Sequence, residues 1–358
     1  MGRLGLLIVA VASGFLVRHY LGALEMPQRV EQALRRGLGE GYRQQIPAPL
    51  AARFEQGVRW GPILRIVPLA RPEVERLRDI QFDRVRGINL KLDVYRHKSR
   101  PSGCPTLLQI HGGGWTIGDK REQALPLMYQ LAAHGWVCVS TNYRLSPHAT
   151  FPEHLVDVKK ALAWIRKHGA DYGADPGFVV VTGGSAGGHL AALVALTAND
   201  PEYQPGFEEV DTTVQAAVPL YGVYDFTDRW GLWPNRGLAR ILETSVMKGS
   251  LAEIPEQYAK ASPLDRIHPD APPFLIVHGS RDTLVPVEEA RRFARELRKV
   301  SRAPVVYLEV PGAQHAFELL PSLNTQAVVD GIERFAAAIY GRYLEGKEKV
   351  SQSRQTGD

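Results

Sequence analysis

The sequence has little cysteine and no long block of one charge. Its 358 residues include two cysteines, Cys104 and Cys138, too few for the disulfide framework of a small secreted domain. Each lies at or near a predicted strand, so we expect buried free thiols, while a bridge between neighbouring strands stays open. The net charge of +5 is spread along the chain, which argues against nucleic-acid binding. This length suits one large α/β domain with additional helices.

The N-terminus carries an apolar run that is short for a membrane span. Leu4–Val17 is uncharged and mostly apolar, between Arg3 and Arg18, whereas a spanning helix needs roughly 20 residues. If the flanking polar side chains reach the headgroups, Leu4–Leu24 could still span a bilayer. We therefore expect residues 1–24 to act as an uncleaved anchor and the protein to be membrane-associated rather than cytoplasmic. A helix packed on its own domain and the cleaved signal of an exported form are the alternatives.

A second region, residues 25–80, precedes the first well-defined strands. Residues 27–37 place apolar side chains at helical spacing and end in glycine, which predicts an amphipathic helix. Residues 45–72 contain proline, tryptophan and apolar patches, a composition that a solvated linker does not have. We expect this region to fold as helices over the following domain, as a cap or lid. A small extra packing layer is the alternative.

Strand-like and helix-like segments alternate over residues 81–343, which we expect to form the catalytic domain. Continuous apolar runs are typical of strands covered on both faces, and their alternation with helices predicts a mostly parallel, doubly wound sheet. We expect an insertion at 225–260, in which Trp230 and Trp233 form a pocket wall, and a polar, disordered tail at 344–358. The predicted strands are 90–95, 106–110, 136–140, 178–182, 214–218, 274–277 and 305–310, and the predicted helices are 122–134, 157–167 and 189–196.

A Gly-x-Ser-x-Gly sequence lies between the strand 178–182 and the helix 189–196. This strand–turn–helix order is what a nucleophile elbow requires, because the tight turn leaves no room for bulky residues beside the nucleophile. Ser185 would then be exposed at a helix N-terminus, where the free N–H group of Ala186 can stabilise a developing negative charge. A glycine-rich turn without chemistry is the alternative.

His111–Trp115 follows the strand 106–110 directly and contains three consecutive glycines. Glycines let the main chain approach a ligand closely and turn its N–H groups inward, as an oxyanion hole requires. A phosphate-binding loop is the rival, but the Lys-Ser/Thr pair of such loops is absent. We expect His111 to brace the loop rather than to act as a base.

Asp282 and His315 each follow a predicted strand, as Ser185 does. The order Ser185, Asp282, His315 is the one expected for a catalytic triad on this kind of sheet, although each residue alone in a loop is usually structural. Asp225 is a rival acid. His278 is a rival base, but we expect it to fix the loop that carries Asp282.

Four features combine in one chain. They are His-Gly-Gly-Gly-Trp at 111–115, Asn-Tyr-Arg-Leu-Ser-Pro at 142–147, Gly-Gly-Ser-Ala-Gly-Gly at 183–188 and the two loops with Asp282 and His315. Together they resemble the hormone-sensitive-lipase-like (HGGG) carboxylesterase family of the α/β-hydrolase superfamily. The resemblance covers about residues 80–343 and implies an α/β-hydrolase fold with an N-terminal helical cap or anchor outside the shared motifs.

The resemblance implies a role for each site residue. Ser185 would be the nucleophile, His315 the base and Asp282 the acid that orients the base. The oxyanion donors would be the N–H groups of Gly113, Gly114 and Ala186. Whether Gly112 replaces one of them stays open. No metal or cofactor is implied.

The chain departs from the family pattern at two places. Gly184 stands where many members carry Asp, and 280–285 reads Ser-Arg-Asp-Thr-Leu-Val where many carry Asp-Pro-Leu. Both departures lean towards carboxylesterases and formamidases. We expect a serine carboxylesterase that acts on short- to medium-acyl, small-molecule esters. An amidase, formamidase or peptidase of the same fold is one alternative; a non-catalytic receptor is another, although such receptors lose the histidine that is present here as His315.

Overall fold

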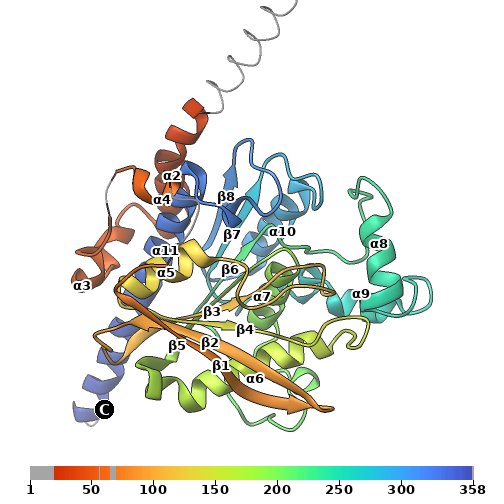
Figure 1. The fold of residues 1–358 in the computed structure, drawn as a ribbon, viewed down its shortest axis with the longest axis horizontal. Helices are drawn as coiled ribbons and strands as arrows, with labels where there is room; N and C mark the ends of the chain where they lie inside the picture. The colour runs from red at the N-terminus through yellow and green to blue at the C-terminus, as the bar shows by residue number, and fades with distance from the viewer. Residues whose placement is uncertain (1–19, 56, 65–69, 357–358) are drawn as a thin grey trace, which may run out of the picture.

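The fold is built on one eight-stranded sheet (Figure 1). The computed structural model describes residues 20–55, 57–64 and 70–356. The strands are β1 (Val74–Val85), β2 (Ile88–His97), β3 (Cys104–Ile110), β4 (Val137–Thr141), β5 (Ala174–Gly184), β6 (Ala216–Leu220), β7 (Phe274–Gly279) and β8 (Val305–Val310). They lie in the order β1-β2-β4-β3-β5-β6-β7-β8. β2 is antiparallel to both of its neighbours, and all other neighbours are parallel, so the mostly parallel sheet is confirmed.

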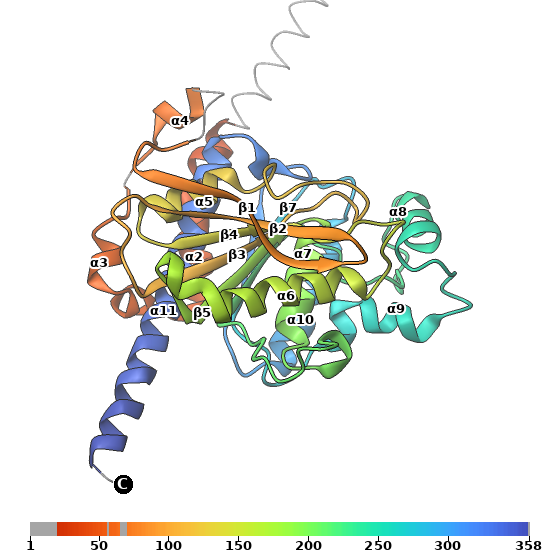
Figure 2. The same cartoon turned by 60° about the horizontal axis from the view of Figure 1, so that its bottom comes forward.

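The sheet separates two apolar cores, because successive side chains of a strand point to opposite faces. The helices are α2 (Met26–Leu38), α3 (Ala48–Ala51), α4 (Trp60–Leu64), α5 (Leu125–Ala133), α6 (Glu153–His168), α7 (Ala186–Leu196), α8 (Gly237–Ile241), α9 (Pro255–Ala261), α10 (Val287–Val300) and α11 (Leu323–Thr356). In β3, Leu107 belongs to the core that includes residues of α2, α5 and α11, whereas Leu108 belongs to the core that includes residues of α6, α7 and α10. The two helix layers are separated by the sheet in Figure 2.

Both cysteines lie in the sheet, Cys104 in β3 and Cys138 in β4. Their thiols are free and buried, as expected. Burial raises the pKa of both thiols, so neither forms the reactive thiolate at neutral pH.

The N-terminal helix α2 belongs to a helix layer of the sheet. It buries every fourth residue from Met26 to Leu38, and this stripe packs on β8 and α11. We expected this region to form a cap or lid, with a small extra packing layer as the alternative. For α2 the structure shows the packing layer. The 3₁₀ helix η1 (Tyr42–Gln45) then leads to α3 and α4.

Two expected boundaries are wrong. β1 begins at Val74 and pairs with β2, with Val74 opposite His97, so the sheet starts before residue 81. The residues from 344 onward, expected as a disordered tail, extend α11 through Thr356. The helix core of α11 nucleates this extension, and the Glu, Lys, Gln and Arg residues that follow are good helix formers.

The expected anchor, residues 1–24, lies outside the described residues up to position 19. Residues 20–24 are helical and lead into α2, with Ala23 buried and Leu21 and Leu24 exposed. Among the helices that the structure describes, none combines the length and the apolar character of a membrane span.

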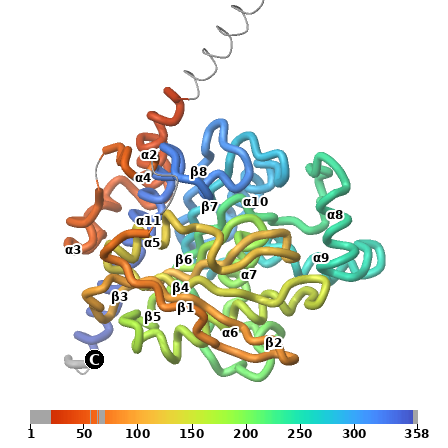
Figure 3. The backbone as a smooth tube through the Cα atoms, in the orientation of Figure 1, coloured from red at the N-terminus to blue at the C-terminus, as the bar shows by residue number. Residues whose placement is uncertain are grey.

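The insertion carries α8 and α9, on the side of the molecule away from α2 and α3 (Figure 3). Trp230 is exposed, and the guanidinium groups of Arg229 and Arg292 lie over its ring at 5.5 and 4.5 Å. The indole N–H of Trp233 donates to Glu289 Oε1 at 2.5 Å. These contacts fasten the insertion to α10, and the pocket wall expected of the two tryptophans stays a prediction.

Glu31 ties α2 to η1. Its carboxylate accepts hydrogen bonds from the Tyr42 hydroxyl (2.7 Å), Arg43 Nη2 (2.7 Å) and Arg35 Nε (2.8 Å). Burial alone would raise the pKa of Glu31, but the hydrogen bonds from Arg43, Arg35 and Tyr42 outweigh it and lower the pKa to about 2. We expect Glu31→Gln to lower the free energy of unfolding at neutral pH by roughly 1–3 kcal/mol.

The same residue makes the stability depend on pH. Because the pKa of Glu31 in the folded protein lies below its usual value of 4.5, its contribution is present above that value and is lost as the pH falls towards 2. Urea unfolding at neutral pH and at about pH 3 should therefore show the gap between Glu31→Gln and the unaltered chain shrinking in acid. Glu40→Gln, which removes an exposed ion pair with Arg35, is the control and should change little. An equal gap at both pH values would contradict the assignment.

Candidate active site

The turn after β5 holds Ser185 in a backbone conformation that few residues adopt. Its φ of 57° and ψ of −120° lie outside the regions favoured for residues with a side chain. The turn is enclosed by main chain: a Cβ on Gly183 would lie 2.5 Å from the Gly187 carbonyl oxygen, and a Cβ on Gly187 would clash with the Ile110 carbonyl oxygen. Glycine is therefore required on both sides of Ser185. The Ser185 N–H donates to the Leu220 carbonyl at 3.0 Å, which ties the turn to β6.

The glycine loop after β3 runs directly beside Ser185. A Cβ on Gly112 would lie 3.2 Å from the Ser185 Cβ. The Gly112 N–H is already bonded to Gln123 Oε1 at 2.6 Å, so it is not free for a ligand. Within the described chain, no acceptor is bonded to the N–H of Gly113 or Gly114. Together with the first N–H of α7, at Ala186, these are the groups available to an oxyanion.

His111 braces this loop. Its ring stacks on Tyr143, with the ring centres 4.4 Å apart, and its Nδ1 lies 2.8 Å from the Gly112 carbonyl. The Tyr143 hydroxyl donates to the His111 carbonyl at 3.0 Å. Burial lowers the pKa of His111, which keeps the ring neutral. These contacts match the expected role of His111 in bracing the loop.

His189 links the glycine loop to the insertion. Its Nδ1 accepts from the Trp115 indole N–H at 3.2 Å, and its Nε2–H donates to the Ala261 carbonyl at 2.7 Å. The ring also stacks on Phe226 at 4.4 Å. Burial lowers the pKa of His189 to about 3. With both nitrogens occupied in the neutral ring, His189 positions Trp115 and the loop that precedes it.

Asp282 and His315 meet across the loops that follow β7 and β8. The Asp282 Oδ2 lies 2.7 Å from His315 Nδ1, and its Oδ1 accepts from the N–H groups of Leu284 and Val285, both at 2.9 Å. Burial would raise the pKa of Asp282, but hydrogen bonds from His278 and His315 hold it well below its usual range. The carboxylate is therefore ionised and fixed in orientation, with the His315 Nδ1–H directed at it.

The two rivals, His278 and Asp225, have other partners than a catalytic base or acid would need. His278 is fully buried; its Nε2 lies 2.9 Å from the Val285 carbonyl and 3.3 Å from Asp282 Oδ2, so it fixes the acid loop. Asp225 is paired with Arg229 at 3.0 Å and accepts from Thr227 Oγ1 at 2.6 Å. Asp282, and not Asp225, is the carboxylate bonded to His315.

Tyr221 contacts both the nucleophile turn and His315. Its ring packs edge-on against the His315 ring, with centres 4.7 Å apart, and its hydroxyl occupies the place that a side chain on Gly184 would take. Burial and the neighbouring Glu318 carboxyl raise the pKa of Tyr221, so the phenol stays protonated. Ser185 and His315 thus flank one buried ring, although within the described residues no hydrogen bond joins the Ser185 hydroxyl to His315.

Three supporting residues could not be singled out from the sequence. Gln123 occupies the N–H of Gly112, Tyr221 replaces a side chain at 184, and Glu318, in the 3₁₀ helix η6 (Phe317–Leu319), is buried beside Tyr221. The one available signal was for Tyr221, which follows a strand directly, as the other site residues do.

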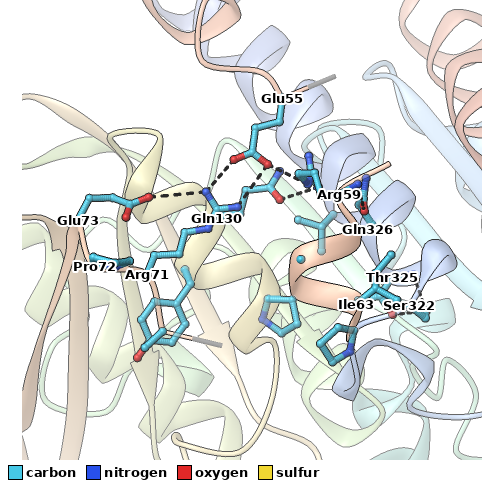
Figure 4. A pocket seen from close by; sticks show the side chains of 16 residues that line it. Glu55, Arg59, Ile63, Arg71, Pro72, Glu73, Gln130, Ser322, Thr325 and Gln326 are labelled. Atoms are coloured by element: carbon cyan, nitrogen blue, oxygen red, sulfur yellow. Dashed lines mark hydrogen bonds and ion pairs between the residues drawn. The ribbon is translucent and has the colours of Figure 1, made fainter. Parts of the chain in front are cut away.

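A cavity of about 700 Å³ lies apart from these residues (Figure 4). It is an open cavity lined by the chain before β1, by α5 and by the start of α11. Arg59 crosses it, paired with Glu55 at 2.8 Å and with Asp330 at 2.7 Å, and Arg71 also pairs with Glu55, at 2.9 Å. Its lining residues are Glu55, Arg59, Gly61, Ile63, Ala70, Arg71, Pro72, Glu73, Pro126, Tyr129, Gln130, Pro321, Ser322, Thr325, Gln326 and Val329. None of them belongs to the Ser185 site.

The architecture is that of an α/β-hydrolase: a nucleophile-elbow turn between β5 and α7, an Asp–His pair after β7 and β8, and a glycine loop after β3. Within the described residues, no cluster of His, Cys, Asp and Glu is arranged to hold a metal ion. The chemistry open to the site is that of a serine activated by a histidine.

Comparison with known proteins identifies the family within this superfamily. The family model of BD-FAE matches residues 92–297, and the chain belongs to this family of hormone-sensitive-lipase-like α/β-hydrolases. LipM of Mycobacterium tuberculosis, a probable carboxylic ester hydrolase, is 51% identical over 259 residues, which are 72% of this chain but only 60% of LipM. Esterase LipQ of the same organism is 41% identical over 90% of this chain and 77% of its own length. The butyrate-bound esterase Est2 of Thermogutta terrifontis has a TM-score of 0.62 and 26% identity, covering 75% of this chain and 95% of Est2.

The geometry predicts which carboxylate activates Ser185. A fluorophosphonate probe should label Ser185, and Asp282→Asn should slow labelling by roughly 10³–10⁴-fold, because His315 would no longer be held in the tautomer that accepts the serine proton. The matched control is Asp225→Asn, which removes a buried carboxylate that is not bonded to His315. If Asp225→Asn slowed labelling more than Asp282→Asn, the acid would be misassigned.

Proposed function

We propose that the chain is a serine carboxylesterase that hydrolyses short- to medium-acyl esters through an acyl-enzyme intermediate. The observation that carries the proposal is the 2.7 Å bond from Asp282 to His315 beside a strained Ser185. The similarity to LipM, a probable carboxylic ester hydrolase, and to esterase LipQ favours the same reaction. Butyrate bound to Est2 favours a short acyl group.

In the proposed mechanism, His315 Nε2 takes the proton of the Ser185 hydroxyl as its oxygen attacks the ester carbonyl carbon. Asp282 holds the ring through Nδ1 and stabilises the imidazolium that forms. The N–H groups of Gly113, Gly114 and Ala186 stabilise the tetrahedral oxyanion. The proton then passes to the leaving alcohol. Water, deprotonated by the same histidine, releases the acid and restores Ser185.

The proposal includes membrane association through residues 1–24. Leu4–Val17 is apolar between two arginines, a pattern suited to an anionic membrane surface. The exposed side chains of Tyr20, Leu21 and Leu24 continue this apolar character into the described helix.

Ser185→Ala should reduce ester hydrolysis by at least about 10³-fold, because a triad loses most of its effect when one member is removed. The fold should be retained, since among the residues that the structure describes none is hydrogen-bonded to the Ser185 hydroxyl. p-Nitrophenyl butyrate hydrolysis and thermal unfolding are the measurements. Ser99→Ala, a surface serine far from the site in sequence, is the control. Unchanged turnover in a folded Ser185→Ala protein would contradict the proposal.

Acyl length is the second test. Tyr221, Gly112 and the main chain pack closely around Ser185, so we expect butyrate and hexanoate esters to be better substrates than palmitate esters. A series of p-nitrophenyl esters gives kcat/KM for each length, and N-formyl amides and peptide nitroanilides belong to the same panel. Efficient hydrolysis of emulsified long-chain triglyceride with poor hydrolysis of butyrate would refute the assignment, and a preference for the amides would move it to the amidases.

The N-terminal segment is the third test. Deleting residues 1–19, which keeps buried Ala23 and α2, should leave an active, soluble esterase, because all eight strands of the described sheet and all proposed site residues follow residue 19. The full-length chain should sediment with membranes. Fractionation and esterase assay of both forms decide the point. A truncated chain that aggregates beside a soluble full-length chain would mean that the segment packs on its own domain.

A further inference from the structure

Large apolar side chains are exposed at the end of the molecule that carries the His315 loop. Leu320, five residues after His315, is 66% exposed, Trp60 in α4 is 46% exposed, and Leu24 before α2 is 40% exposed. Single exposed apolar residues are normal on soluble proteins and need no explanation. These three come from segments far apart in sequence, so their relative positions decide whether they form one surface.

Helix packing places Leu24 and Leu320 at the same end. α2 and α11 run parallel: Val30 contacts Gly331, where a Cβ would lie 2.6 Å from Val30 Cγ1, and Arg342 Nη2 donates to the Leu38 carbonyl at 3.1 Å. Residues 20–24 therefore extend past the start of α11, alongside the loop that leads into it. Figure 1 shows both helices beginning at this end.

Trp60 lies at that end too. Its neighbour Arg59 donates its backbone N–H to Gln326 Oε1 at 3.0 Å, and Gln326 Nε2 donates to the Gly57 carbonyl at 2.9 Å. Gln326 is in the first turn of α11, so residues 57–60 are fixed beside the same helix start. Ile117 and Leu284 are also exposed. They lie in the loops that follow β3 and β7, at the same edge of the sheet as the His315 loop.

The three segments at this end carry little exposed charge, and the exposed ion pair of Glu25 and Arg29 follows directly after the first of them. Residues 20–24 carry none, and in 311–322, the loop that contains His315, the one charged residue is Glu318, which is buried. Arg59 is neutralised by its ion pairs with Glu55 and Asp330. An uncharged surface with exposed aromatic and aliphatic side chains loses little on leaving water.

We infer that this end, which we call the apolar end (residues 20–24, 57–60 and 311–322), docks on a lipid bilayer, so that the His315 loop faces the membrane. The occupant is a bilayer rather than a second copy, because the residues that precede Tyr20 continue the apolar character over Leu4–Val17, and arginines flank that run as at a membrane surface. The docking does not depend on the reaction. If the proposed function holds, esters dissolved in the bilayer reach Ser185 from the lipid side.

Single labelled cysteines in the full-length chain test this orientation. Leu320→Cys and Leu24→Cys would carry an environment-sensitive dye (NBD), and the two native thiols, being buried, would stay unlabelled. The matched control is Val300→Cys, 41% exposed at the end of α10 and next to the start of β8, hence at the opposite edge of the sheet. With phosphatidylcholine–phosphatidylglycerol vesicles, the dyes at 24 and 320 should shift to the blue and be quenched by brominated lipid. The dye at 300 should do neither.

Three results would overturn the inference. A lipid-exposed dye at 24 beside a solvated dye at 320 would mean that the N-terminal segment alone holds the protein to the bilayer. Blue-shifted dyes at 24 and 320 without vesicles would mean that residues 1–19 or a second copy cover the apolar end, and cross-linking would separate these two. Equal quenching at 300 would mean that docking has no orientation. Hydrolysis of p-nitrophenyl butyrate, measured on the same samples, tests the proposed esterase separately.

Discussion

The close approach of three main-chain segments determines the site. The end of β3, the turn at Ser185 and the first turn of α7 touch through backbone atoms, and a Cβ on Gly183 or Gly187 would push them apart. Because β3 and β5 are neighbours in the sheet, this contact brings the glycine loop alongside Ser185. The free N–H groups of Gly113 and Gly114 in that loop and the first N–H group of α7 are therefore the donors proposed for an oxyanion. Without that contact the proposed oxyanion donors would have no fixed position relative to Ser185, the proposed nucleophile.

A second consequence concerns residue 184. Many members of the resembling family carry a carboxylate there, whereas this chain has glycine and fills the space with the Tyr221 ring. The exchange keeps the volume beside the nucleophile occupied but replaces a charge by a neutral phenol. That phenol also supports the edge of His315. Because the pKa of Tyr221 is raised, its phenol is neutral where it packs against the His315 ring. The negative charge bonded to His315 is the carboxylate of Asp282.

The sequence predicts best what local patterns control. The parallel strands, the turn at Ser185 and the loops of Asp282 and His315 each follow from a strand and the residues directly after it. The structure brings Asp282 and His315 into contact, while the catalytic roles of the site residues stay predictions. Gln123 and Glu318 escaped notice because their partners are set by tertiary packing, which no short pattern encodes. The residues after 344 were predicted to be disordered because their sequence is polar. They are helical because they continue a helix whose earlier turns are anchored in the core.

The placement of the apolar end follows from the same topology. α11 starts where the His315 loop ends, because a helix that follows a parallel strand must begin at the strand's carboxyl edge. α2 runs parallel to α11, so its start, and with it the entry of the N-terminal segment, lies at that edge too. An antiparallel α2 would have delivered the segment to the opposite edge, beside Val300. The direction of one helix therefore decides whether an N-terminal attachment holds the reactive loops towards a membrane or away from it.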